Sequence, residues 1–585
     1  MPISDEEWQD LLAHEIPSPD DPVIQKYLSS KEALTAEEKK HRADNSFRQA
    51  LSPIAKKACT IFSRLLAEES ETPEEAEAED PTKSYTILQL LPKGALLNVR
   101  LHDLIDLTHL AELAIETEGL LISCAEAGGN LATSEARRRE RRRRNASTVR
   151  IRVGKAAAAA SEGGSGSGLG LGSSIWSRDY KPNSLVNLAE AADSFPEHGR
   201  AGFLTWLRGR FLGPAAGEDE DGGSERKVVV VEEDSAESLL CEVVYYEPIF
   251  RATLQRVLDL LVLDGVSWAE LRLKNDTPRR LIFPIKFYRE SSETPEEDYD
   301  YLFKVIREEV AGFRAGLKSD QTFWGIRVIW STSSTVTEQR ALIQDMDDCI
   351  TTKISYPDLV AGYDPSSVLT KASKEGYIVP SLFWFRKQCA VEGVEVPFLF
   401  GSTSGDDLFH TLLLGARRVG IKDEGRKMLN HPRFLEAVKD KKILVGVEPM
   451  PLVPVWRGAK RSRWSTAGTV EGLAAQGVSC AIGVNEERCL SRELWNVLNE
   501  ANGKGEEANL DLATLGWMAE NSVRWAGFED SNAGDWTREI REASVGSGTK
   551  AERLRKWAVE WEKFCLCVVD EFGEDVDVGG DDKVE

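Results

Sequence analysis

PKGALLNVRLH, residues 92–102, is the stretch that decides the fold. Its centre, residues 96–101, is mainly apolar and has the composition of a buried strand. The polar residues Asn98 and Arg100 lie within this run, and His102 follows it. Similar short apolar runs alternate with amphipathic helical patterns as far as residue 569, at 268–273, 325–330, 396–400, 443–447 and 478–483. Repeated alternation of strand and helix predicts a parallel α/β fold, and a (β/α)8 TIM barrel is the architecture we expect.

The composition is that of a globular protein with an acidic surface. The chain has 585 residues, of which 41% are hydrophobic and 29% are charged, and a net charge of −24. The length allows a large core, and the negative charge disfavours general attraction to nucleic acid or anionic lipid. No apolar run is long enough to cross a bilayer, and the first residues lack the features of a secretory signal. The nine scattered cysteines then predict reduced thiols and a cytoplasmic location.

Three regions are expected along the chain. Residues 1–87 form a helical N-terminal region that ends in an acidic linker, residues 88–569 form the barrel, and residues 570–585 are an acidic tail. Two low-complexity insertions, at about 125–174 and 214–235, are predicted to be disordered surface loops. The first contains RRRERRRR at residues 137–144, which could serve nuclear import but is more simply a solvated segment or a partner of the acidic loop.

The opening stretch resembles P-K-G-x-L-L-H-x-H-L-D, the first-strand motif of the adenosine deaminase family, and it is closest to the adenosine deaminase-related growth factor subfamily. Other similar blocks follow in family order over roughly residues 48–568. DGVSWAELR at 264–272 is similar to D-x-V-x-Y-x-E-x-R, YPDLVA at 356–361 to F-D-L-V-G, and AENSV at 519–523 to the late L-x-x-L-A-x-N-S-I helix. The chain is thereby identified as a divergent, fungal-type member of the subfamily, with the metal-dependent hydrolase barrel that this implies.

The resemblance implies a zinc site whose ligands are missing. In the family a zinc ion activates the water that attacks the purine ring. Its ligands are two histidines at the end of the first strand, a third histidine in H-A-G-E after the fifth, and an aspartate after the eighth. Asn98, Arg100, Gly401 and Asn485 stand at these four positions, so we expect neither zinc nor another cofactor.

The family's catalytic side chains are also replaced. The glutamate of H-A-G-E, which shuttles the proton, becomes Ser404. The histidine that orients the attacking water becomes Ile421, and the second late aspartate becomes Glu486. With Gly401, these degenerate positions leave no catalytic residue of the family intact.

A ligand pocket is still expected at the carboxyl ends of the strands, where such barrels bind their ligands. Its candidate residues are Arg100, His102, Trp206, Ala361, Glu448 and Glu486. A buried guanidinium needs a carboxylate partner. We therefore expect Arg100 to fill the vacated metal volume and to pair with Glu486 or Glu448.

These substitutions favour a catalytically inactive pseudoenzyme that binds a small ligand or a protein partner, with a purine nucleoside as the inherited candidate ligand. One alternative is an active adenosine deaminase, an aminohydrolase that converts adenosine to inosine through another way of activating water. A second alternative is a scaffold that acts through its charged loops. The resemblance also implies a homodimer formed through the N-terminal helices.

Overall fold

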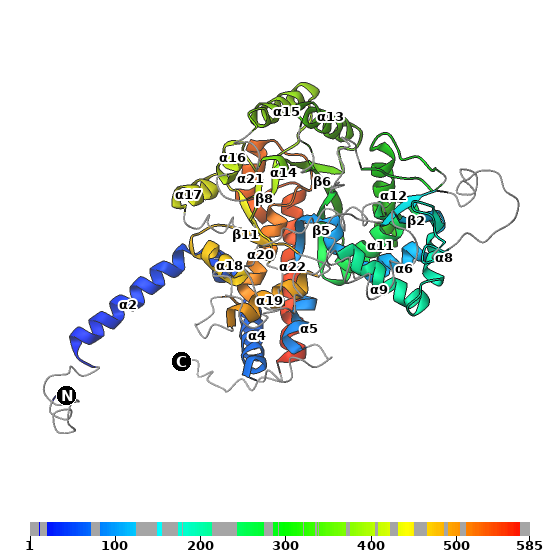
Figure 1. Ribbon diagram of the computed structural model, residues 1–585. Coiled ribbons are helices and arrows are strands. Elements are labelled where there is room, and N and C mark those ends of the chain that lie inside the picture. The colour runs from blue at the N-terminus through cyan, green and yellow to red at the C-terminus, as the bar shows by residue number, and fades with distance from the viewer. Residues whose placement is uncertain are drawn as a thin grey trace, which may run out of the picture.

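Eight parallel strands form the centre of the molecule, and helices cover them (Figure 1). The structure is a computed structural model that describes residues 11, 20–71, 82–124, 149–154, 174–177, 179–212, 243–273, 285–290, 292–319, 321–333, 336, 338–369, 375–403, 407–421, 431–449, 465–484, 489–502 and 510–573. The central strands are β1 (Gly94–Arg100), β5 (Val266–Leu273), β6 (Gly325–Ser331), β7 (Val360–Asp364), β8 (Leu399–Thr403), β9 (Arg418–Ile421), β10 (Leu444–Val447) and β11 (Cys480–Ile482).

These strands form two four-stranded sheets in the orders β1-β5-β6-β7 and β11-β10-β9-β8. Every ladder within the two sheets is parallel. An isolated parallel bridge between Tyr363 of β7 and Phe398, just before β8, joins one sheet to the other. In the described residues no ladder joins β11 to β1. The predicted α/β fold with parallel strands is therefore confirmed, whereas its closure into a barrel stays a prediction.

Helices alternate with the strands, as the sequence patterns predict. The helices of this part of the chain are α11 (Glu247–Leu263), α12 (Asp300–Gly316), α13 (Gln339–Ser355), α14 (Ser366–Leu369), α15 (Ile378–Glu392), α16 (Asp407–Leu413), α17 (Pro432–Asp440), α18 (Thr466–Ala475), α19 (Leu490–Asn502), α20 (Leu512–Arg524), α21 (Ala533–Glu542), the short η4 (Ala543–Val545) and α22 (Thr549–Phe572). None of the helices that the structure describes is long and apolar enough to span a bilayer.

Helix α20 spans the gap between the two outermost strands. Ser522 accepts a hydrogen bond from the Ala95 amide of β1 at 2.8 Å, and Asn521 donates to the Cys480 carbonyl of β11 at 3.1 Å. The helix comes so close to β1 that only glycine fits at residue 94, because a Cβ there would lie 2.8 Å from the Ala519 carbonyl oxygen. The AENSV block therefore holds β1 and β11 at a fixed separation.

A small subdomain is inserted between β1 and α11. It contains η2 (Leu101–Leu104), α6 (Leu107–Glu116), β2 (Leu120–Cys124), β3 (Val149–Val153), β4 (Val186–Asn187), α8 (Leu188–Asp193) and α9 (Gly199–Leu212), with an antiparallel sheet in the order β3-β2-β4. Strand β3 lies inside the segment 125–174 for which the sequence predicted only loop. Val149 and Ile151 alternate with arginines and are buried against β2, which is the pattern of a half-buried strand. The arginine run at 137–144 and the insertion at 214–235 lie outside the described residues.

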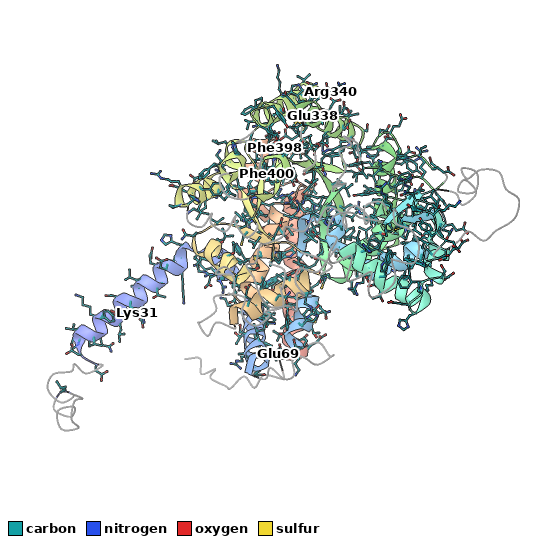
Figure 2. All side chains as sticks on the ribbon, in the orientation of Figure 1. Lys31, Glu69, Glu338, Arg340, Phe398 and Phe400 are labelled. Atoms are coloured by element: carbon teal, nitrogen blue, oxygen red, sulfur yellow. The ribbon has the colours of Figure 1, made fainter. Side chains whose placement is uncertain are left out.

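The N-terminal residues form α2 (Pro22–His41), α3 (Asn45–Ala50), α4 (Pro53–Glu71) and α5 (Lys83–Leu90). Helix α2 has no buried residue and extends away from the body, with Lys31 on its free part and Glu69 far from it at the end of α4 (Figures 1 and 2). The buried carboxylate of Asp44 pairs with Arg48 at 2.8 Å, and Arg48 pairs with Asp511 at 2.7 Å. Since Asp511 caps the N-terminus of α20, this chain of charges fixes α3 to the strand core.

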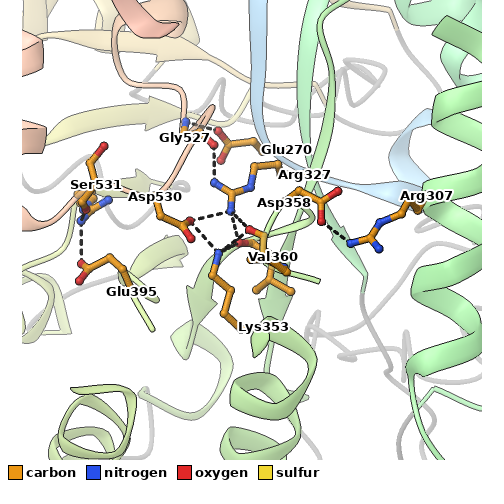
Figure 3. A network of polar contacts seen from close by, with 12 residues as sticks. Glu270, Arg307, Arg327, Lys353, Asp358, Val360, Glu395, Gly527, Asp530 and Ser531 are labelled. Atoms are coloured by element: carbon orange, nitrogen blue, oxygen red, sulfur yellow. Dashed lines mark hydrogen bonds and ion pairs between the residues drawn. The ribbon is translucent and has the colours of Figure 1, made fainter. Parts of the chain in front are cut away.

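A network of buried cations closes the amino ends of the strands (Figure 3). Arg327 of β6 and Lys353 of α13 donate to the same Asp530 carboxylate oxygen, at 2.8 and 2.7 Å, and both donate to the Val360 carbonyl. Lys550 of α22 donates to backbone carbonyls at 3.0 and 3.1 Å and lies 3.7 Å from the Trp536 ring centre. The network ties the segment after α20 to β6 and β7.

We predict that this network makes the stability depend on pH. Burial lowers the pKa of Lys550 to about 7, and burial with the nearby Arg327 charge lowers the pKa of Lys353 to about 8. Above pH 7 the unfolded chain keeps a proton on Lys550 that the folded chain releases, so the free energy of unfolding rises with pH. We expect Lys550→Met to reduce this rise between pH 7 and 8.5, by up to about 1.4 kcal/mol per pH unit.

Urea unfolding at pH 6.5, 7.5 and 8.5 measures the effect. Lys556→Met is the matched control, because Lys556 lies on the same helix with half of its side chain exposed. Equal pH slopes for the natural chain and Lys550→Met would show that Lys550 is charged in the folded protein throughout this range.

Candidate functional site

Strand β1 bends at Asn98, the first of the expected ligand positions. Asn98 has a left-handed backbone, with φ of 63°, which asparagine tolerates better than most residues. The register of β1 against β5 shifts between Leu96 and Val99, so the strand carries a bulge here. The Asn98 side chain crosses to the other sheet, where Nδ2 donates to the Phe400 carbonyl oxygen of β8 at 3.2 Å. The bulge therefore turns Asn98 toward the space between the two sheets.

Arg272 of β5 reaches the carboxyl ends of three other strands. Its Nε donates to the Asn98 carbonyl oxygen at 3.1 Å, and its Nη1 donates to Asp364 Oδ2, at the end of β7, at 3.4 Å. Its Nη2 lies 3.7 Å from Glu448 Oε1, just after β10. The Arg272 side chain is 13% exposed and that of Asp364 is 3% exposed, so this is a largely buried charge cluster. One guanidinium therefore connects both sheets at their carboxyl ends.

Gly401 of β8, where the family has its third histidine, lies directly against this guanidinium. A Cβ at residue 401 would lie 2.3 Å from Arg272 Nη1 and 2.7 Å from Asp364 Oδ2. The Gly401 amide donates to the other oxygen of Asp364 at 3.1 Å. No side chain fits at this position while Arg272 and Asp364 keep theirs. The guanidinium beside ligand position 401 is thus that of Arg272, which the sequence did not single out for the pocket.

Arg100 has a local carboxylate partner. Its Nε and Nη2 donate to the two oxygens of Asp103 at 2.9 and 2.8 Å. His102 lies beside the pair, with Nε2 at 3.7 Å from Asp103 Oδ1. Arg100 was expected to pair with a carboxylate, and Asp103 is such a partner. The helix η2 begins directly after β1, and its turn brings the Asp103 side chain back beside Arg100. Of the partners that were expected, Glu448 lies near Arg272, and Glu486 lies outside the described residues.

A cavity of about 40 Å³ lies between the two sheets beneath these charges. Its walls come from β1, β5 and β8–β11, including the first residues of β9 and β10, and from the residues just after several of these strands. The lining residues are Leu97, Asn98, Val99, Arg100, Asp103, Arg272, Phe400, Arg418, Val419, Gly420, Leu444, Gly446, Val447, Glu448, Ala481, Ile482, Gly483 and Val484. A cavity of this size has room for about three water molecules, so its enclosed part is much smaller than a nucleoside.

Arg418, one of the lining residues, belongs to a second ion pair. Arg418 of β9 pairs with the buried carboxylate of Glu270 in β5 and donates to the Trp525 carbonyl oxygen at 3.3 Å. Burial alone would raise the pKa of Glu270, but the Arg418 charge and hydrogen bonds lower it below its ordinary value. Glu270 is therefore an ionised partner of Arg418 and no proton donor at neutral pH.

The other positions singled out in the sequence are scattered. Ile421 is buried in β9, and Ala361 of β7 packs with Ile329 and Leu399 away from the cavity. Trp206 of α9 packs in the inserted subdomain against the aromatic rings of Trp176, Phe195 and Phe203. Ser404, Asn485 and Glu486 lie outside the described residues. Of the pocket candidates, Arg100 and Glu448 line the cavity, whereas His102, Trp206 and Ala361 do not.

The described side chains do not fit a zinc ion. Zinc takes imidazole nitrogen, thiolate or carboxylate oxygen, whereas Asn98 offers an amide, Arg100 a fixed positive charge and Gly401 no side chain. In the part of the chain that the structure describes, no group of three or more His, Cys, Asp and Glu side chains is arranged to hold a metal. The fourth expected position, Asn485, lies outside that part.

Two residues of the site were missed in the sequence, namely Asp103 and Asp364. Asp364 is the last residue of β7 and Asp103 lies three residues after β1, and a carboxylate near the carboxyl end of a parallel strand is a recognisable signal of a site. Asp364 is also 3% exposed and accepts a hydrogen bond from the Ser366 amide at 2.9 Å. The sequence did not indicate which cation pairs with Asp364, because Arg272 is distant from it along the chain.

Known proteins resemble this chain only at low identity. No protein-family model and no curated protein matches it. An amidohydrolase from Burkholderia ambifaria with bound zinc is 12% identical, with a TM-score of 0.42 over 85% of this chain and 97% of that one. The ADAL–IMP complex is 12% identical, with a TM-score of 0.41 over 79% and 99%. Adenine deaminase from Arthrobacter aurescens is 10% identical, with a TM-score of 0.31 over 51% and 80%. None of these similarities identifies the reaction or ligand of this chain.

We predict that Arg272 is required for stability. Arg272→Met leaves the buried carboxylate of Asp364 without its cation, and we expect the free energy of unfolding to fall by about 3 kcal/mol. Adding Asp364→Asn should recover part of this loss, because the uncompensated charge is then removed. Urea unfolding of the single and double variants measures both effects. Arg538→Met, at an exposed ion pair, is the control and should cost less than about 1 kcal/mol. A similarly small loss for Arg272→Met would contradict this role.

Proposed function

We propose that this chain is a metal-free, deaminase-like barrel that binds a small ligand at the carboxyl ends of its strands and does not deaminate adenosine. In this proposal the two sheets close around the cavity, with α20 at the seam between β11 and β1. The family assignment rests on the motif order in the sequence. The loss of activity rests on the side chains at Asn98, Arg100 and Gly401, none of which is a zinc ligand.

The single observation that carries the proposal is that the described ligand positions supply no zinc ligand, since Asn98 offers an amide, Arg100 a guanidinium and Gly401 no side chain. At Gly401 the side chains of Arg272 and Asp364 fill the volume that a ligand side chain would need. The carboxylates that could attract a divalent ion, Asp364 and Glu448, already pair with Arg272.

The described carboxylates around the cavity are engaged with guanidinium groups. Asp103 pairs with Arg100, Asp364 and Glu448 pair with Arg272, and Glu270 pairs with Arg418. Hydrolytic deamination needs an activated water and a proton shuttle. Binding without chemistry is therefore the function that this arrangement supports best.

The test is the metal content and deaminase activity of the full chain. We expect elemental mass spectrometry of protein expressed with added zinc to find much less than one zinc per chain, and adenosine to release no ammonia above background. Asp364→Asn combined with Glu448→Gln is the control that separates zinc in this pocket from zinc on the surface. One zinc per natural chain that this double variant loses, together with ammonia release, would overturn the proposal.

A further inference from the structure

The cavity exists because small residues line three neighbouring strands. Gly446 of β10 is paired with Gly420 of β9 on one side and with Ala481 of β11 on the other. Parallel strands that enclose an interior usually fill it with bulky side chains. A Cβ at Gly446 would have its nearest neighbours at 3.7 and 3.9 Å, and one at Gly483 at 3.8 Å, so side chains could be accommodated there. The backbone therefore does not require glycine at residues 446 and 483, whereas at Gly420 it does, because a Cβ there would lie 2.3 Å from the Gly401 carbonyl oxygen.

Three buried polar atoms of cavity-lining residues make no hydrogen bond among the described residues. They are the Nε–H donor of Arg418, a residue that is only 3% exposed, the Oδ1 acceptor of Asn98, and Oε1 of Glu448, which forms an ion pair with Arg272 at 3.7 Å. Leaving a buried polar atom without a hydrogen bond costs about as much as a lost hydrogen bond, so such atoms are usually satisfied by water or a ligand. The cavity thus offers one donor and, at Asn98, one neutral acceptor.

Among the residues that the structure describes, the charges around the cavity are almost balanced. Three guanidinium groups pair there with four carboxylates, namely Arg272 with Asp364 and Glu448, Arg418 with Glu270, and Arg100 with Asp103. An anion would meet the excess carboxylate, and a cation would meet the guanidinium of Arg272. A neutral molecule avoids both penalties.

We infer that the cavity is a binding site for a small neutral molecule with both a hydrogen-bond donor and an acceptor, of the primary carboxamide class. The inference rests on the proposed function, because it takes the pocket to be free of metal. The amide carbonyl accepts from Arg418 Nε–H, and the amide N–H donates to Asn98 Oδ1. The glycines at the cavity wall provide the room that this ligand occupies.

Acetamide, acetone and acetate are matched probes, because each has four heavy atoms and nearly the same shape. Acetone lacks the donor, and acetate lacks the donor and carries a charge. A ligand of four heavy atoms reaches a Kd of roughly 40 µM at the very best, so millimolar probe concentrations are appropriate. We expect 20 mM acetamide to raise the thermal unfolding midpoint of the full chain by ~1 °C or more, and acetone and acetate to raise it much less.

Gly446→Val fills the cavity and should abolish the acetamide effect. Gly483→Ala is the second variant if Gly446→Val does not fold. Gly312→Ala is the control and should keep the full effect, since Gly312 lies exposed on α12 and a Cβ added there would have no atom within 4 Å.

Three outcomes would overturn the inference. The first is an equal response to all three probes, and the second is an acetamide effect that survives Gly446→Val. The third combines two results: the natural chain responds to none of the probes, and the Gly446→Val variant is at least as stable as the natural chain. This third outcome would mean that the cavity holds water only. None of these outcomes involves zinc or ammonia release, so they leave the proposed function standing.

Discussion

The buried guanidinium of Arg272 is the constraint on which the site depends. An arginine in this environment must have acceptors, because the cost of an unpaired buried charge exceeds most single contributions to stability. Its acceptors come from different strands: a carbonyl on β1, Asp364 on β7 and Glu448 after β10. The two sheets are therefore held in one relative position at their carboxyl ends. The bulge at Asn98 follows from the same requirement, since it accompanies the carbonyl that accepts from Arg272 Nε.

The opposite ends of the strands are held in a different way. There Arg327 and Lys353 share Asp530, and Arg418 pairs with Glu270, so the segment after α20 is bound to both sheets. Burial makes these cations expensive, and their lowered pKa values at Lys353 and Lys550 express that cost. Buried ion pairs of this kind contribute little net stability. Here they fix the position of the segment after α20 across the strands. Arg418 belongs both to these ion pairs and to the cavity wall, so it connects the amino ends of the strands with the pocket.

Much of the strand–helix order could be predicted from the sequence. The apolar runs at 268–273, 325–330 and 443–447 overlap β5, β6 and β10, because a buried parallel strand needs a short continuous apolar segment. The strand β3 was missed, since its alternating valines and arginines lie inside a low-complexity insertion. The ion pairs of the site could not be predicted reliably. Arg100 pairs with Asp103, three residues away in the sequence, whereas Arg272 of β5 pairs with Asp364 of β7 on the far side of β6. Nothing local in the sequence distinguishes the two cases.

Two glycines, Gly401 beside Arg272 and Gly446 at the cavity wall, differ in whether a side chain would fit there. Gly401 is glycine because Arg272 and Asp364 fill the volume that a side chain would need. Gly446 has no such neighbour, and a methyl group there would make only ordinary contacts. A void that backbone geometry does not require is expected to be filled in a well-packed interior, because each missing contact costs stability. Its persistence beside the unpaired polar atoms of Arg418 and Asn98 is therefore better explained by an occupant than by poor packing.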